Sequence, residues 1–228
     1  MSSDLIRIGV VDSGYAAHQA VAASAAFVLH DHQLWLDESQ PDQLDHGSRV
    51  IEVIAALAPE AELVCAQVFQ ARYTTSAAQV AAAIDWLVDQ DVHVINLSLG
   101  LRNDSAGLRE ACQRAATKGV ILSAASPARG DPVFPAAYPG VFRMTGDARC
   151  ARNEISYLDS RFADFGACVR PMDDAIGSAG ASLGCAHLTA KVARYLQSSG
   201  TASVGAVHAW LQTQASYHGP ERRVVADG

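Results

Sequence analysis

The chain has 228 residues, half of them hydrophobic, and a formal net charge of −7. This length fits one α/β domain over 1–228, and the acidic balance argues against nucleic acid as a partner. No apolar run is long enough to cross a bilayer, so we expect no membrane partner either.

Strands and helices are predicted to alternate along the chain. Short apolar runs rich in β-branched residues predict strands, and amphipathic segments bounded by Ser or Gly predict helices. The Gly- and Pro-rich stretch 128–140 predicts a loop. This order predicts a three-layer α/β fold, with a mostly parallel central sheet and helices on both faces. The expected strands are 6–12, 62–69, 92–100, 120–126 and 140–147, and the expected helices are 47–57, 76–90, 106–119, 181–199 and 203–215.

The N-terminus and the cysteines predict the compartment. A strand begins almost at once, without the basic and apolar regions of a signal peptide, so we expect neither a signal peptide nor a pro-domain. The five cysteines are odd in number, scattered and without CxxC spacing. They are expected to be free thiols in a reducing, cytoplasmic environment.

Ser182 lies in a segment that fits two kinds of site. Residues 180–184, Gly-Ala-Ser-Leu-Gly, match the G-x-S-x-G nucleophile elbow of esterases and lipases. An elbow needs a strand directly before its serine and the chain order Ser, acid, His. The residues before Ser182 are polar, and the acids after it stand in the last few residues of the chain. The elbow is therefore disfavoured, and a serine that opens a long helix is favoured.

Five short motifs place an Asp, a His and a Ser in that order along the chain. The motifs are VVDSG (10–14), DHGSRVIEVIAAL (45–57), VINLSLG (94–100), FPAAYPGVFRMTG (134–146) and GASLGCAHLTAKVARYL (180–196). The order Asp, His, Ser is the one that subtilisin uses. With these motifs the chain resembles the subtilisin-like serine proteases over nearly its whole length, and the resemblance implies the subtilisin-like fold and serine endopeptidase activity.

The chemistry of a triad then assigns three catalytic roles. Ser182 would attack the peptide carbonyl, His46 would accept its proton, and Asp12 would orient and stabilise the imidazole. Each residue also has a plain alternative: Asp12 as a turn cap, His46 as a surface loop residue, Ser182 as a helix N-cap. Their joint occurrence in triad order favours the catalytic interpretation.

The resemblance also implies a substrate-binding groove. Ser98, Leu99 and Gly100 would pair with an extended peptide by β-augmentation, and Ala124 and Ala125 would form the opposite wall. The loop 128–140 is expected to border the pocket for the residue before the scissile bond.

The second oxyanion donor departs from the family pattern. The backbone N–H of Ser182 would supply one donor. The family usually supplies the other from an Asn, but this chain has Ser126 and Pro127 there. Ser126 or a backbone N–H within 128–131 is expected to replace it. Arg49 likewise stands where a second His is common.

Two further residues near Ser182 are expected to be structural. Cys185 is predicted to be a small buried residue, and His187 a packed one. No His, Cys or carboxylate grouping indicates a metal site, and we expect neither a metal nor another cofactor.

Three functions are compatible with these residues. The favoured one is a selective intracellular protease that removes the leader from a partner precursor, within a maturation complex. The small Asn-lacking form resembles the subtilisin-like proteases that process the γ-subunit of quinohemoprotein amine dehydrogenase. The second is a pseudoprotease that only binds peptides. The third is a transpeptidase or macrocyclase of ribosomal peptides, which would need a cover that excludes water.

Overall fold

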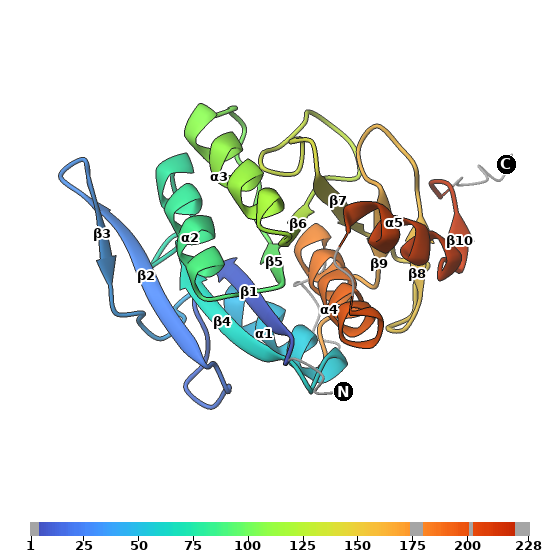
Figure 1. The fold of residues 1–228 in the computed structure, drawn as a ribbon, viewed down its shortest axis with the longest axis horizontal. Coiled ribbons are helices and arrows are strands. Elements are labelled where there is room, and N and C mark those ends of the chain that lie inside the picture. The colour runs from blue at the N-terminus through green and yellow to red at the C-terminus, as the bar shows by residue number, and fades with distance from the viewer. Residues whose placement is uncertain (1–4, 174–179, 201–202, 222–228) are drawn as a thin grey trace, which may run out of the picture.

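A ten-stranded, mostly parallel sheet forms the centre of the molecule (Figure 1). The computed structural model describes residues 5–173, 180–200 and 203–221. Within them the strand order is β10-β8-β9-β7-β6-β5-β1-β4-β2-β3. The strands are β1 (Arg7–Asp12), β2 (Ala23–His30), β3 (Gln33–Asp37), β4 (Glu62–Gln67), β5 (Val94–Leu97), β6 (Ile121–Ala125), β7 (Val141–Gly146), β8 (Ile155–Tyr157), β9 (Phe165–Ala167) and β10 (Tyr217–His218).

The strand order reverses at β1, which lies between β4 and β5 and is parallel to both. After β1 the chain builds one side of the sheet with β2, β3 and β4, and then crosses to β5 on the other side. Sites in open α/β sheets form at the carboxyl ends of strands beside such a switch point. Asp12 ends β1 and Ser98 follows β5, so both residues stand at that place.

The helices cover the two faces of the sheet in separate groups. The helices α1, α4 and α5 contribute to one buried apolar cluster, and α2 and α3 contribute to the other. The two clusters are separated by the sheet, so the molecule has the three layers expected from the sequence. The helices are α1 (His46–Leu57), α2 (Ala77–Asp89), α3 (Ala106–Thr117), α4 (Ala181–Ser199) and α5 (Val204–Thr213).

Three helix boundaries follow local signals in the sequence. Ser76 caps α2 in a reciprocal capping box with Gln79, and Ser203 caps α5 by accepting from the N–H of Ala206. Gly119 follows α3 with φ +83°, a conformation in which a side chain would be strained.

All ten elements expected from the sequence are present, with shorter strands than expected. The loop at 128–140 is also confirmed, apart from an isolated bridge between Leu101 and Phe134. The sequence did not indicate the hairpin of β2 and β3, nor the short strands β8, β9 and β10. These strands have two to eight residues, and the three shortest are too short for a hydrophobic period to stand out.

Three further observations concern the cysteines, the helices and possible metal ligands among the described residues. All five cysteines are buried and unpaired. No described helix is long and apolar enough to cross a membrane. No three His, Cys, Asp or Glu side chains in the described ranges are grouped so that they could hold a metal ion.

Candidate active site

Asp12 occupies the last position of β1 and is completely buried. Its Oδ1 accepts hydrogen bonds from the backbone N–H of Ser13 and from Nδ1 of His46, both at 2.7 Å. Its Oδ2 is buried without a donor from the described residues. The imidazole of His46 is therefore the one side chain that donates to this carboxylate among the described residues.

His46 is the first residue of α1, and two contacts fix the start of this helix. The backbone N–H of Gly47 donates to Ser13 Oγ at 2.9 Å. A Cβ at Gly47 would lie only 2.3 Å from the carbonyl oxygen of Gly14, so only glycine lets the helix approach the turn after β1 this closely. The glycine after His46 thus brings the imidazole to Asp12.

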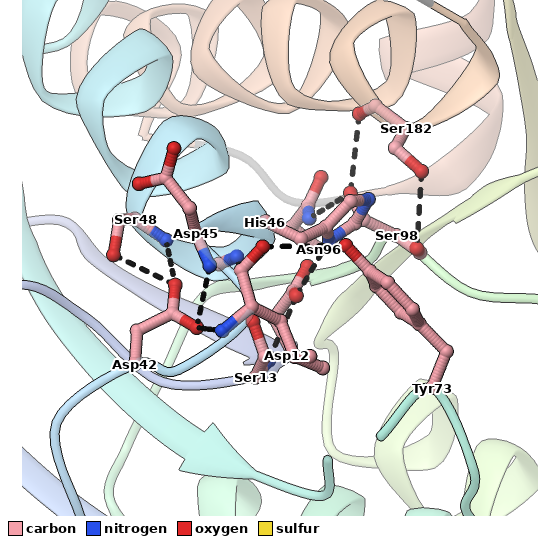
Figure 2. Close-up of polar contacts among 12 residues, drawn as sticks. Asp12, Ser13, Asp42, Asp45, His46, Ser48, Tyr73, Asn96, Ser98 and Ser182 are labelled. Carbon is pink, nitrogen blue, oxygen red and sulfur yellow. Dashed lines mark hydrogen bonds and ion pairs between the residues drawn. The ribbon is translucent and has the colours of Figure 1, made fainter. Parts of the chain in front are cut away.

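Asp42 holds the chain that leads into α1 (Figure 2). Its Oδ1 accepts from the N–H groups of Leu44 and Asp45, and its Oδ2 accepts from both the N–H and the hydroxyl of Ser48. A carboxylate at a helix N-terminus accepts hydrogen bonds from the free N–H groups and interacts favourably with the positive end of the helix dipole. Partial burial raises the pKa of Asp42, but its hydrogen bonds together outweigh burial and hold this pKa below its ordinary value.

The surroundings of His46 raise the pKa of its imidazole. Burial by itself lowers this pKa, but the hydrogen bond to Asp12 and the charges of Asp12 and Asp42 together outweigh it. An acceptor on Nδ1 leaves Nε2 of the neutral ring as the proton acceptor. His46 therefore has the tautomer and the basicity that a general base requires.

Ser182 is the second residue of α4, and the two glycines of its G-x-S-x-G motif have separate structural roles. Gly180 is the N-cap, with φ +151°. A Cβ at Gly184 would lie 2.1 Å from the carbonyl oxygen of Thr145 at the end of β7. Residues 168–173 contain no strand, and 174–179 lie outside the described residues. The motif therefore reflects a helix start packed against β7.

A chain of buried polar groups connects Ser182 to β5. Ser182 Oγ donates to the carbonyl oxygen of Ser98 at 3.2 Å, and Ser98 Oγ donates to the carbonyl oxygen of Ser182 at 3.1 Å. Figure 2 shows this reciprocal contact as two dashed lines. Behind it, Asn96 Nδ2 donates to Ser98 Oγ at 2.8 Å, and Thr189 Oγ1 donates to Asn96 Oδ1 at 3.0 Å.

The Ser182 hydroxyl points to Ser98 in this structure and not to the base. Among the described residues, no hydrogen bond joins Ser182 Oγ to His46 Nε2, and the hydroxyl donates to Ser98 O instead. Ser98 directly follows β5, whose Leu97 is the register partner of Val11 in β1. Ser182 therefore lies at the same sheet edge as Asp12, and a rotation about its χ1 reorients its hydroxyl.

Both donors of Ser126 are engaged away from Ser182. Its backbone N–H donates to Met144 O at 2.8 Å, and its hydroxyl donates to Phe162 O at 2.6 Å. The next residue, Pro127, has no N–H to offer. Ser126 is thus a poor oxyanion donor. The backbone N–H groups of 128–131 remain, and none of them donates to another described residue.

The expected groove residues lie at the ends of neighbouring strands. Ser98, Leu99 and Gly100 follow the end of β5, and Ala124 and Ala125 end β6, the next strand of the sheet. Their contact with a substrate stays a prediction.

The loop at 128–140 lines a cavity of about 660 Å³ together with Ser126 and Pro127. Val133, which lines this cavity, packs directly on Gly100, where a Cβ would lie 2.9 Å from the valine side chain. The loop therefore closes over the end of the segment 98–100. The cavity is not lined by the three residues predicted to be catalytic.

The residues predicted to be structural are buried. Cys185 has no exposed surface, and burial raises the pKa of its thiol to about 12, so it is not a nucleophile at neutral pH. His187 is buried in α4, where burial lowers its pKa, and its Nε2 donates to Arg170 O at 3.4 Å.

Arg49 forms ion pairs with Asp45 and Asp173.

The sequence predictions missed two supporting residues. Asn96 is a fully buried amide within the apolar strand β5, and a polar residue in such a run is the signal that was available. Tyr73 packs edge-on against His46 at 5.9 Å between ring centroids, and its hydroxyl donates to Leu44 O at 3.3 Å. Its place in a polar loop gave no comparable signal.

This combination defines a class: a subtilisin-like peptidase domain, with an Asp–His pair and a helix-opening serine at the carboxyl ends of a parallel sheet. The chain belongs to the subtilase family, whose family model matches residues 4–156. That match includes Asp12 and His46 but ends before Ser182, so the assignment of the serine depends on its place in the structure.

Individual relatives are bacterial proteases. The chain is 33% identical over 151 residues to the thermostable alkaline protease of Halalkalibacterium halodurans, covering 60% of this chain and 40% of that one. It is 32% identical over 146 residues to subtilisin Savinase of Lederbergia lenta, covering 58% and 52%. The minor extracellular protease Epr of Bacillus subtilis is 29% identical over 167 residues, covering 68% and 24%. The matched part is thus between a quarter and about half of each relative.

Proposed function

We propose that this protein is a serine endopeptidase that acts inside the cell and removes a leader from one partner precursor. The observation that carries the proposal is the 2.7 Å hydrogen bond from His46 to the buried Asp12, at the same sheet edge as Ser182. Family membership supports the same chemistry. The two residues are 34 positions apart, so their pairing depends on the fold.

The reaction would begin with rotation of the Ser182 hydroxyl from Ser98 O to His46 Nε2. Ser182 Oγ then forms a bond to the peptide carbonyl carbon while His46 takes the hydroxyl proton. The same proton passes to the leaving amine as the C–N bond breaks. His46 then takes a proton from water while the water oxygen bonds to the acyl carbon, and it returns this proton to Ser182 Oγ as the acyl-oxygen bond breaks. Asp12 stabilises the imidazolium in each half-reaction.

The lack of the usual oxyanion donor supports selectivity for one substrate. Pro127 replaces a side-chain donor, and the loss of one such donor, as measured in subtilisin itself, slows catalysis by about two to three decades. Low intrinsic activity suits a protease that shares a compartment with other proteins. Binding energy from one partner would then supply the rate that the site lacks.

Labelling with a fluorophosphonate tests the chemistry. We expect an adduct that maps to Ser182 by mass spectrometry, and we expect its loss in the variants His46→Ala and Ser182→Ala. Ser182 labelled equally well without His46 would contradict the triad. The variant His187→Ala is the matched control, because His187 lies on α4 but is turned into the core.

Incubation with leader-bearing precursors tests selectivity. The γ-subunit precursor of quinohemoprotein amine dehydrogenase is the first to try, since the sequence resembles its processing proteases. We expect one cleavage and little hydrolysis of casein. Broad digestion of casein would exclude a maturation role, and a product mass without the added water would indicate transpeptidation.

A peptide-binding pseudoprotease is the second candidate, and two observations favour it. The Ser182 hydroxyl is bonded to Ser98 O and not to His46, and both Ser126 donors are occupied. Tight precursor binding without any labelling of Ser182 would establish this function in place of proteolysis.

A further inference from the structure

The β2–β3 hairpin exposes an unusual amount of apolar surface. The described residues include seven large hydrophobic side chains that are well exposed, and four of these are on this hairpin: Leu29, Leu34, Trp35 and Leu36. Every residue of β3 is exposed, and β3 forms one edge of the sheet, at the left of Figure 1. Proteins usually protect such edges with charges or proline, yet the middle of β3 has neither.

The turn determines which backbone groups of β3 are unpaired. Asp31 and His32 both have positive φ, at 48° and 61°, as in the two-residue type I′ hairpin. The closing pair His30–Gln33 exchanges backbone hydrogen bonds, and alternate pairs do the same along the hairpin. Trp35 therefore bonds inward to β2. The N–H and C=O groups of Leu34 and Leu36 point outward from the sheet.

We propose that β3 pairs antiparallel with β3 of a second copy of this chain, around a two-fold axis at Trp35. Leu34 then lies opposite Leu36 of the second copy, and each such pair exchanges both of its outward backbone hydrogen bonds. The two Trp35 residues form the central non-hydrogen-bonded pair, in which side chains come closest. The two sheets become one continuous sheet.

The side chains select a second copy in this register because β3 matches its own reverse. Its sequence is Gln-Leu-Trp-Leu-Asp, so the central register places Leu opposite Leu and the amide of Gln33 opposite the carboxylate of Asp37. The backbone also allows registers centred on Leu34 or Leu36. The first places Leu36 opposite the turn residue His32, and the second places Trp35 opposite Asp37. Only the central register pairs apolar with apolar and donor with acceptor.

Sedimentation velocity tests the association. The interface is small, so we expect a dimer that forms as the concentration rises from about 1 to 100 μM. The variant Trp35→Lys places two ammonium groups opposite each other and should be monomeric. Leu5→Lys is the matched control, because Leu5 is 50% exposed but lies off the hairpin, and it should remain dimeric. A wild-type monomer over this whole range overturns the proposal, as does a dimer that Trp35→Lys leaves intact.

Disulfide trapping tests the register. The five native cysteines are buried, so an added surface cysteine reports alone. Trp35→Cys should form a dimer-linking disulfide under diamide, since residues of a non-hydrogen-bonded pair lie about 4.5 Å apart between Cα atoms. Leu34→Cys should not, because Leu34 faces Leu36 of the second copy. Equal trapping by both variants, or trapping only by Leu34→Cys, overturns the register. Fluorophosphonate labelling of Ser182 is independent of these results, so the function and the dimer can fail separately.

Discussion

At the scale of single residues, the candidate site depends on the hydrogen bond between the Asp12 carboxylate and the His46 imidazole. Asp12 is buried, and its accepted hydrogen bonds come from Ser13 and His46. An ionised carboxylate in such a place stabilises an imidazolium more than it would in water. The raised pKa of His46 is the consequence, and it has a measurable effect on the pH dependence of the reaction.

We expect the acid limb of kcat/KM to lie above pH 6.5, the ordinary pKa of histidine. The base must be neutral to accept a proton, so a raised pKa moves the loss of activity to higher pH. Asp12→Asn should move this limb down and lower kcat by about 10⁴, the loss seen when other triads lose their Asp charge.

Asp45→Asn is the matched control for that pH profile. It removes a carboxylate next to His46 in sequence that does not contribute to the raised pKa. Its acid limb should coincide with that of the wild type. An Asp12→Asn variant with an unshifted limb would show that another group titrates.

Pro127 gives a second prediction at this scale. Pro127→Asn adds a side-chain amide and a backbone N–H next to Ser126, whose own donors are occupied. We expect kcat to rise by about tenfold or more, within the two to three decades that one donor can contribute. Steady-state hydrolysis of a peptide ester would measure it. An unchanged kcat would mean that the N–H groups of 128–131 already hold the oxyanion.

At the scale of elements, two helices have in their first turn a glycine that lets the helix backbone contact the backbone of a neighbouring segment. Gly47 lets α1 approach the turn after β1, and Gly184 lets α4 approach the end of β7. A close approach of backbone to backbone cannot be relieved by a change of rotamer. These glycines therefore position His46 and Ser182, although neither takes part in the chemistry.

We expect Gly47→Ala and Gly184→Ala to destabilise the fold by about 1–3 kcal/mol each, the usual cost of overpacking. Gly107→Ala in α3 is the control, since nothing lies within 4 Å of a Cβ there. It should stabilise the protein by up to about 1 kcal/mol, the difference in helix propensity. Urea unfolding measures all three. Equal effects at Gly107 and Gly184 would contradict the role of close packing.

At the scale of the whole molecule, the three site residues belong to one cooperative unit. The helices α1 and α4 pack with β1 in a single apolar cluster that covers one face of the sheet. Asp12, His46 and Ser182 lie at the ends of these elements. The site is therefore expected to be lost together with that cluster.

Ile54→Ala tests this coupling far from the chemistry. Ile54 is a fully buried residue of α1, and its truncation should cost about 2–5 kcal/mol. Fluorophosphonate labelling of Ser182 and far-UV circular dichroism should then shift together along a urea titration. Labelling that disappears well before the helical signal would mean that the site unfolds locally.

Much of the fold was predictable because local signals were strong. Apolar β-branched runs indicated five strands of the parallel core, β1 and β4 to β7, and Ser or Gly indicated several helix ends. The hairpin of β2 and β3 was missed because β3 is wholly exposed and the three buried residues of β2 are consecutive, so neither strand has a clear alternating period. Asn96 was missed because its role depends on a network that only the fold assembles. Thr189, which donates to it, is 93 positions away in the sequence. Ser98 is close in the sequence, but its contact with Ser182 was not predictable.

The sequence by itself determined the order Asp12, His46, Ser182 and the absence of the usual oxyanion Asn, because these are matters of residue identity. Only the tertiary structure decided how the groups are engaged. In the structure His46 is hydrogen-bonded to Asp12, and the Ser182 hydroxyl donates to Ser98 O. Both donors of Ser126 are also engaged in hydrogen bonds. The reason is physical: a hydrogen bond depends on distance and direction, and these are fixed by contacts between elements that are remote in the chain.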